Sequence, residues 1–319
     1  MSVNPTDTID VSLLTYINQR KVITQSHLEG GIPDYAYGSD YVLRQKINAI
    51  PGVYRFFKAL TNQVVPYLKQ QINLTALKVG PDQFPEVYQI TQECARRLGI
   101  GMPTIFVQSN MSEMNAGAYC FEDDSPLITI TSGLLERFTK GELKVVIGHE
   151  CGHVHNNHLI YTTAVNTILQ SFQMTIPGVR QIIAMGSAPI QYALMAWSRA
   201  AEVTCDRAGI ICSDSFDDEI SSKAKFLYGA AFDSAKVNVD AILKQYDMLR
   251  QTPVRLLEMQ ADHPIPVRRI FASKEFFQSE VLYQWRPELK TPGMSLISKQ
   301  ELDARCEKYI GVLKSGKRG

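Results

Sequence analysis

The segment that most constrains this chain is "VVIGHECGHVHNNH", residues 145 to 158, which holds four of the six histidines within ten positions. If the segment is helical, His149 and His153 are four residues apart and project from one face, with Glu150 at its edge. This is the HExxH pattern, in which two imidazoles bind zinc and a carboxylate lies beside the site of hydrolysis. The alternative is a solvated polar helix end, so a third ligand elsewhere in the chain would favour the metal site.

A candidate third ligand lies in "MAWSRAAEVTCDRAG", which predicts a helix with one apolar face. On its flank, Glu202 and Asp206 are again four residues apart. Zinc in hydrolases commonly takes two histidines and one glutamate, and ligating histidines usually donate their other N–H to a carboxylate. Glu202 is therefore a predicted ligand, and Asp206 a predicted partner of a ligand histidine. The alternative, a surface pair of Glu202 with Arg199 or Arg207, is less favoured beside an HExxH helix.

Charge and cysteine usage narrow the class of protein. The 319 residues carry a formal net charge of +1, which gives no reason to expect nucleic acid as a partner. The six cysteines form no CxxC pair and no disulfide-scaffold spacing. The start of the chain, "MSVNPTDTIDVSLL", lacks a basic stretch followed by an apolar one, so no secretory signal is predicted. We expect a soluble protein in the reducing cytoplasm.

Two long stretches without Asp, Glu, Lys or Arg raise the question of a membrane. These are residues 151–179 and 181–198. A spanning helix needs about 20 predominantly apolar residues, and the histidine, asparagine, glutamine and proline in these stretches prevent that. We expect two buried or half-buried helices and no spanning segment, with peripheral membrane contact left open.

The order of predicted elements indicates an α+β fold. Residues 1–80 read as helices interrupted by a turn-rich loop, and a helix is predicted between Pro85 and Gly99. Short strands are predicted at 104–107, 116–121 and 127–131. A capping box, Thr139 with Glu142, predicts the start of the HExxH helix, and helices continue almost to the end. We expect an N-terminal helical region, 1–80, packed on a catalytic domain, 81–319.

The chain resembles the HtpX-like and CAAX-prenyl-protease-like zinc metallopeptidases, within the gluzincins. The resemblance covers roughly residues 40 to 275. It rests on four blocks, of which the second and third are highly specific: "NAGA" at 115–118, "ELKVVIGHECGHVHNNH", "WSRAAEVTCDRAG", and "DHPIPVRRI" at 262–270. The resemblance implies one zinc ion per chain, with these roles: ligands His149, His153 and Glu202, general base Glu150, and Asp206 beside the ligands.

The chain departs from the family in two respects. The membrane members of the family carry several transmembrane helices, which are missing here, so the resemblance is to a soluble branch. Cys151 and Cys205 stand where small or apolar residues are more common. A thiolate near zinc could compete as a ligand, but a buried free cysteine usually acts as a small hydrophobe, which is the preferred interpretation of both.

The "NAGA" block predicts how substrate is held. Ala116, Gly117 and Ala118 have small side chains, which allow another backbone to approach as an added strand. The alternative is that Gly117 only marks a bulge. The resemblance favours substrate binding here, with Asn115 contacting the peptide, and main-chain recognition of this kind selects extended polypeptide.

Roles are also expected for four further residues. The resemblance offers His263 as the donor that stabilises the oxyanion, although a cap at a helix start before Pro264 is equally compatible. Arg199 is expected to order the ligand helix or to pair with a nearby carboxylate. His155 and His158 are expected to lie off the zinc face, capping or solvating the helix end.

The favoured function is a zinc endopeptidase acting on extended or unfolded polypeptides. A second interpretation is a latent form of the same fold, in which the N-terminal region or a loop covers the cleft until it is displaced. A third is a non-catalytic binding module, which the intact Glu150 disfavours because such a protein has no need of the base.

Overall fold

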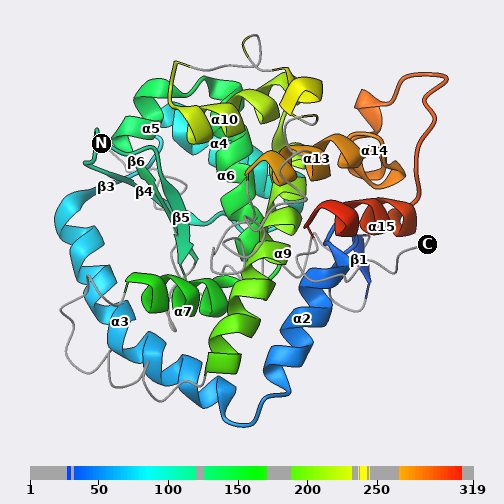
Figure 1. The fold of residues 1–319 in the computed structure, drawn as a ribbon. Helices are drawn as coiled ribbons and strands as arrows, with labels where there is room; N and C mark the ends of the chain where they lie inside the picture. The colour runs from blue at the N-terminus through cyan, green and yellow to red at the C-terminus, as the bar shows by residue number, and fades with distance from the viewer. Residues whose placement is uncertain are drawn as a thin grey trace.

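A computed structural model of the chain describes residues 27–29, 32–119, 126–170, 188–231, 236, 238–242, 244 and 266–310. The N-terminal part pairs two short strands and continues into two helices. Their bounds are β1 Leu28–Glu29, β2 Ile32–Pro33, α2 Gly38–Asn48 and α3 Val53–Thr75. The middle part contains β3 Ala76–Lys78, α4 Pro85–Leu98, β4 Thr104–Gln108, β5 Ala116–Tyr119 and β6 Leu127–Thr131. The α+β prediction is confirmed, because helices dominate and surround a small sheet formed by β3, β4, β5 and β6 (Figure 1).

Helices make up most of the rest of the described chain. They are α5 Ser132–Arg137, α6 Lys140–His155, α7 Leu159–Gln170, α9 Ala188–Cys212 and α10 Phe216–Tyr228. The C-terminal part contributes α13 Pro266–Phe276, α14 Glu280–Trp285, the 3-10 turn η5 Pro287–Leu289 and α15 Lys299–Ile310. None of the described helices is long and apolar enough to cross a membrane. Residues 171–187, which include Arg180 and the adjoining ends of the two uncharged stretches, lie outside the described residues.

Local chemistry explains where the key helices begin and end. Thr139 Oγ1 accepts from the backbone N–H of Glu142 at 3.3 Å, and Glu142 Oε2 accepts from the N–H of Thr139 at 2.7 Å. The predicted capping box therefore starts α6. Pro85 occupies the first turn of α4, and Gly99 ends that helix with a φ of 65°, a left-handed conformation that glycine adopts without strain.

The sheet has the strand order β3-β4-β6-β5, with β4 and β6 parallel and the other neighbours antiparallel. Strand β5 lies at one edge, where it pairs with β6 from Ala116 opposite Ile130 to Tyr119 opposite Leu127. The pairing is continuous through Gly117 opposite Thr129, so the alternative of a bulge at this glycine is wrong. The other edge of β5 has no strand partner among the described residues.

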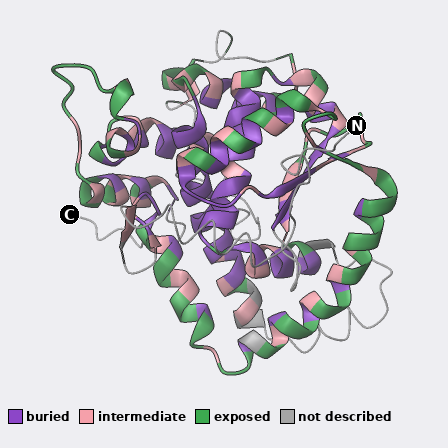
Figure 2. Ribbon diagram, turned by 180° about the vertical axis from the view of Figure 1, so that it is seen from behind, coloured by how far each residue is buried: buried purple, intermediate pink, exposed green. Residues whose placement is uncertain are grey.

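The main core lies between the sheet, α4, α6 and α9, where α6 and α9 are buried along most of their length (Figure 2). These two helices touch almost backbone to backbone. A Cβ added at Gly148 would lie 2.5 Å from Cys212 Cβ, and one added at Gly152 would lie 2.7 Å from Ala208 Cβ. The small residues therefore set the separation of the helices that carry the HExxH motif and Glu202.

We expect Gly148→Ala to destabilise the protein by about 1 to 2 kcal/mol, because overpacking usually costs about 1 to 3 kcal/mol and alanine recovers up to about 1 kcal/mol of helix propensity. Chemical denaturation of the metal-free protein would measure this. Adding Cys212→Gly removes the clashing atoms, so the two changes should cost less together than the sum of their separate costs. A Gly148→Ala protein as stable as the parent would contradict this close packing.

A second core lies between α3, α7 and the first half of α9, with Trp197 and Phe57 fully buried in it. The outer faces of α2 and α3 are exposed (Figure 2). Tyr35 and Tyr37, from the N-terminal part, belong to the main core together with residues of α6. The division into regions 1–80 and 81–319 remains a prediction.

Candidate active site

The three predicted ligands come together where α6 crosses α9. His149 Nε2 lies 3.4 Å from Glu202 Oε2, and His153 Nε2 lies 3.6 Å from Glu202 Oε1. The two imidazoles are edge to face, with centroids 5.1 Å apart. Their side chains are 13% and 8% exposed and that of Glu202 is 6% exposed, so the carboxylate faces the histidines and not solvent. Glu202 is therefore not an exposed surface group, which contradicts the less favoured alternative of a surface pair with Arg199 or Arg207.

Asp206 contacts the outer nitrogen of the first histidine, as predicted. Its Oδ1 lies 3.1 Å from His149 Nδ1. The carboxylate is only 2% exposed, so Asp206 is not a surface partner of Arg207. Arg207 instead pairs with Asp303 at 2.8 Å. A carboxylate at Nδ1 favours a proton there, so that Nε2, on the side of Glu202, is the nitrogen that can bind a metal ion.

Two cations that the sequence analysis missed, the buried Lys223 and the half-buried Arg269, complete this cluster. Arg269, in α13, donates to Asp206 at 2.6 and 2.8 Å and lies 2.9 Å from Glu202. Lys223, in α10, lies 3.0 Å from Asp206 and also pairs with Glu219. Arg269 lies inside the "DHPIPVRRI" block, and its position in that block is the sequence feature that could have identified it. No sequence feature pointed to Lys223.

The balance of charge around the histidines suits a cation. Burial by itself lowers the pKa of His149, but the carboxylates of Glu202 and Asp206 outweigh it and raise that pKa to about 9. Burial likewise acts to raise the pKa of Asp206, but Arg269 and Lys223 hold it far below its usual range. A site that favours positive charge and offers two imidazole nitrogens and a carboxylate oxygen matches the donor set of a catalytic zinc ion.

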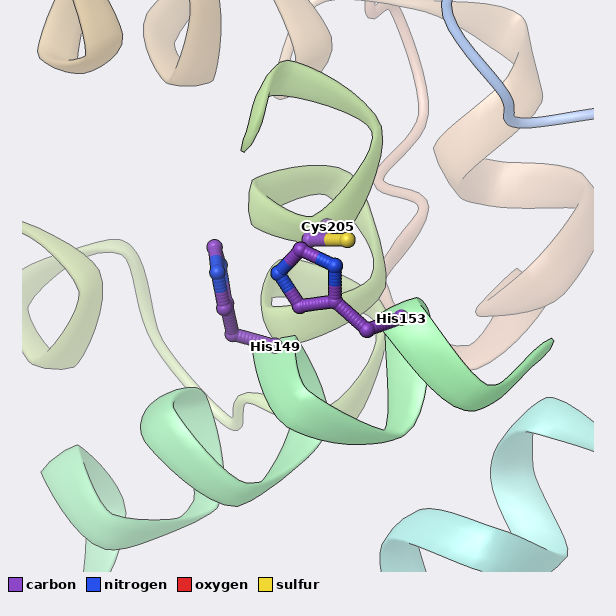
Figure 3. A group of neighbouring side chains, drawn as sticks. All are labelled: His149, His153 and Cys205. Carbon is purple, nitrogen blue, oxygen red and sulfur yellow. The ribbon is translucent and has the colours of Figure 1, made fainter. Parts of the chain in front are cut away.

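Cys205 is the ambiguous member of this cluster. With His149 and His153 it forms a group whose potential ligand atoms lie within 4.8 Å of one another, beside the His153 ring (Figure 3). The cysteine is fully buried, and burial raises the pKa of its thiol well above the usual range. A thiol that stays protonated is a poor metal ligand. Cys151 is also fully buried, within the main core, in agreement with the apolar interpretation.

The predicted base and substrate-binding residues line one open pocket of about 470 Å³. Glu150 is 7% exposed and lies in this pocket with the ligand residues. Burial, and after it the nearby Glu150 carboxylate, raise the pKa of Tyr119 at the end of β5. Residues 115 to 118 form the neighbouring wall. The structure thus brings the edge strand alongside the HExxH helix.

Two hydrogen bonds hold Asn115 in place. Its N–H donates to Thr131 Oγ1 at 3.0 Å, and its side-chain Oδ1 accepts from the N–H of Ala116 at 2.9 Å. Arg199 lies in α9, one turn before Glu202, and is 7% exposed. His263 lies outside the described residues, and its predicted role in oxyanion stabilisation is therefore still a prediction.

The expectation for the two remaining histidines of the segment was wrong in one respect: neither is solvated. His155 is 1% exposed and contacts Tyr35 Oη at 3.0 Å. His158 is fully buried, and its Nδ1 lies 3.3 Å from His153 Nδ1. His158 follows the end of α6, so helical periodicity alone did not place it beside a ligand.

Comparison with known proteins identifies the family of this chain. The model of the family described as peptidase family M48 matches residues 81–276. "Plastoglobule-localized metallopeptidase 48, chloroplastic" of Arabidopsis thaliana is 30% identical over 242 residues, which cover 73% of this chain and 69% of that protein. "Protease HtpX homolog" of Acaryochloris marina is 32% identical over 129 residues, covering 40% of this chain and 41% of the relative.

"Protease HtpX" of Acinetobacter baumannii is 34% identical over 86 residues, covering 27% of this chain and 28% of the relative. The matched segment therefore spans less than half of either bacterial protein. No solved structure matches the chain significantly.

Proposed function

This chain belongs to peptidase family M48, and we propose that it is a zinc-dependent endopeptidase, which hydrolyses peptide bonds within extended or unfolded polypeptides. The observation that carries the proposal is the convergence of His149 and His153 on Glu202, at 3.4 and 3.6 Å, in the wall of an open pocket. The plant relative is named as a metallopeptidase, which agrees with a metal at this position.

His149, His153 and Glu202 would hold the zinc ion, and Asp206 would keep the His149 ring oriented. Bound zinc would lower the pKa of a water molecule from about 15.7 to about 7, which supplies a nucleophile in neutral solution. Glu150, buried in the same pocket, would accept the proton of this nucleophile and later pass it to the leaving amine. His263 remains the proposed donor to the developing oxyanion.

Strand β5 supports the choice of substrate class. Residues 116 to 119 of this strand line the pocket, one edge of the strand has no strand partner among the described residues, and residues 116 to 118 have no large side chains that would hold a second backbone away. A peptide bound there as an added strand must be extended, which selects unfolded segments more than a particular sequence. Asn115, at the start of the strand, would contact the same peptide.

A latent form is the second candidate, in which the N-terminal region covers the cleft. The pocket is lined by residues from 115 onwards, and none of the described residues between 27 and 80 lines it. This favours the active form for the described part of the chain. A cytoplasmic location is part of the proposal. The plant relative, named as plastoglobule-localized, makes peripheral contact with a lipid surface the alternative.

Removal of a ligand tests the metal assignment. The parent protein should contain one zinc ion per chain, and His153→Ala should lower the zinc content sharply because one of three protein ligands is lost. Metal analysis after dialysis would measure this. His155→Gln is a matched control, because His155 is also buried on α6 but contacts Tyr35, and zinc content should be unchanged. Full occupancy in His153→Ala would reject the site.

A further inference from the structure

The ligand His153 is the start of a buried chain of polar contacts that leads away from the pocket. Its Nδ1 lies 3.3 Å from His158 Nδ1, and His158 Nε2 lies 3.0 Å from Asp40 Oδ2. The side chains of His158 and Asp40 are 0% and 3% exposed. We infer that His158 and Asp40 are positioning residues, which fix the tautomer of His153 so that its Nε2 can bind the metal. The inference rests on the proposed metal site.

The hydrogen positions in this chain of contacts follow from the Asp40 carboxylate. An ionised carboxylate only accepts hydrogen bonds, so the His158 nitrogen that faces Asp40 carries the hydrogen. The N–H of His158 Nε2 does not point straight at Asp40 Oδ2. A lone pair on this nitrogen would nevertheless face the negative oxygen at 3.0 Å, so the hydrogen is favoured there. In the neutral His158 ring, Nδ1 is then an acceptor. His153 Nδ1 must donate to it, which leaves the Nε2 of His153 with its lone pair exposed.

The other neighbours of this chain agree with these assignments. Trp197 Nε1 and Thr204 Oγ1 donate to the two oxygens of Asp40 at 2.8 and 2.7 Å, so every observed partner of the carboxylate is a donor. Cys205 Sγ lies 3.6 Å from His158 Nδ1. Because its buried thiol is protonated, it can only add a second, weak donor to the same nitrogen.

Asp40 comes from outside the segment that matches the family. It lies in α2, whereas the family model covers residues 81–276. Helix α2 packs along α9, and the donors Trp197 and Thr204 of α9 hold the carboxylate. The N-terminal part of the chain therefore supports a metal ligand from behind, on a side that does not line the pocket.

Nuclear magnetic resonance of the metal-free protein tests the inference directly. Long-range ¹H–¹⁵N correlation of histidine-labelled protein reports which nitrogen of each ring carries the hydrogen, and the chain has only six histidines to assign. We expect the hydrogen on Nδ1 of His153 and on Nε2 of His158. A His153 ring that carries its hydrogen on Nε2 would overturn the inference, whatever the metal affinity.

The Asp40→Asn variant tests the consequence for the metal. An amide can donate to His158 Nε2, which would move the hydrogen of His158 to Nδ1 and that of His153 to Nε2. Since losing such an outer partner typically costs about 10- to 100-fold in metal affinity, zinc binding measured against a chelator should weaken by this factor. Unchanged tautomers and affinity would overturn the inference.

Thr204→Val is the matched control, because it removes a donor to the same carboxylate without changing the group that faces His158. It should lower the stability of the protein and leave zinc affinity and both tautomers as in the parent. An equal loss of affinity in both variants would mean that Asp40 only stabilises the packing of α2, and would refute the positioning role.

A second pair of variants covers the case in which Asp40→Asn does not fold. His158→Asn can present its carbonyl oxygen near the position of Nδ1 and should retain most of the zinc affinity, whereas His158→Leu should lose about 10- to 100-fold. Equal affinities in these two variants would contradict the inference. If the parent protein binds no zinc, the proposed function fails, but the tautomers of the metal-free parent still decide the inference.

Discussion

Glu150→Gln should abolish most peptide hydrolysis while zinc content and fold are retained. The amide has nearly the shape of the carboxylate but cannot accept a proton, and general acid–base groups are worth about 10² to 10⁴ in rate. Glu150 is buried in the pocket beside the two histidines, so no large rearrangement is needed for it to act. Hydrolysis of unfolded casein by the full chain, with zinc analysis and thermal denaturation of the same samples, measures the effect.

Glu150→Asp is the informative companion, because it keeps a proton acceptor but draws it back by one methylene group. Misplacement of a catalytic group by about 1 Å can cost about 10²-fold, so an activity between those of the parent and Glu150→Gln is expected. Turnover near the parent level in Glu150→Gln would mean that another group takes the proton. The assignment of the base would then be wrong even if the zinc site is correct.

Asp206→Asn should weaken zinc binding and also destabilise the metal-free fold. The carboxylate contacts His149 Nδ1 at 3.1 Å, and an amide there can donate a hydrogen and favour the wrong tautomer. The expected loss of zinc affinity is about 10- to 100-fold, measured by chelator competition. Breaking a buried ion pair typically costs about 3 to 5 kcal/mol, and the lower end applies because Glu202 and Glu219 still face Arg269 and Lys223.

Glu219→Gln separates these two effects. Glu219 is fully buried and pairs with Lys223, as Asp206 does, and Ser273 donates to it, but no contact links it to His149. It should lower stability without changing zinc affinity. Equal zinc affinities in Asp206→Asn and the parent would remove Asp206 from the site.

The stability difference between the parent and Asp206→Asn should also depend on pH. The folded protein holds the pKa of Asp206 below its usual range, so this carboxylate stabilises the fold fully above the unfolded pKa of about 3.9. The contribution is lost as the pH falls further, because protons then bind the unfolded state first. Denaturation of the metal-free proteins at neutral pH and near pH 3 would show the difference shrink, and a difference that grows in acid would contradict the assignment.

Much of this site follows from the sequence because its spacing is local. Residues four apart on a helix share a face, so His149 with His153, and Glu202 with Asp206, could be paired from the sequence alone. The capping box at Thr139 and the proline and glycine that bound α4 likewise depend only on neighbouring residues. For the same reason three of the four strands of the sheet were predicted nearly in full, whereas β3, Ala76–Lys78, lies in a region that was expected to be helical.

The tertiary structure decided which side chains surround those pairs. Small residues let α6 and α9 approach closely enough for Glu202 to face both histidines, and no sequence pattern measures that distance. Arg269 and Lys223 reach Asp206 from two further helices. Asp40 reaches His158 across 118 positions of sequence, from a helix with no recognised motif. Such contacts depend on how buried charges find partners when separate helices pack, and helical periodicity describes only the face that each helix presents.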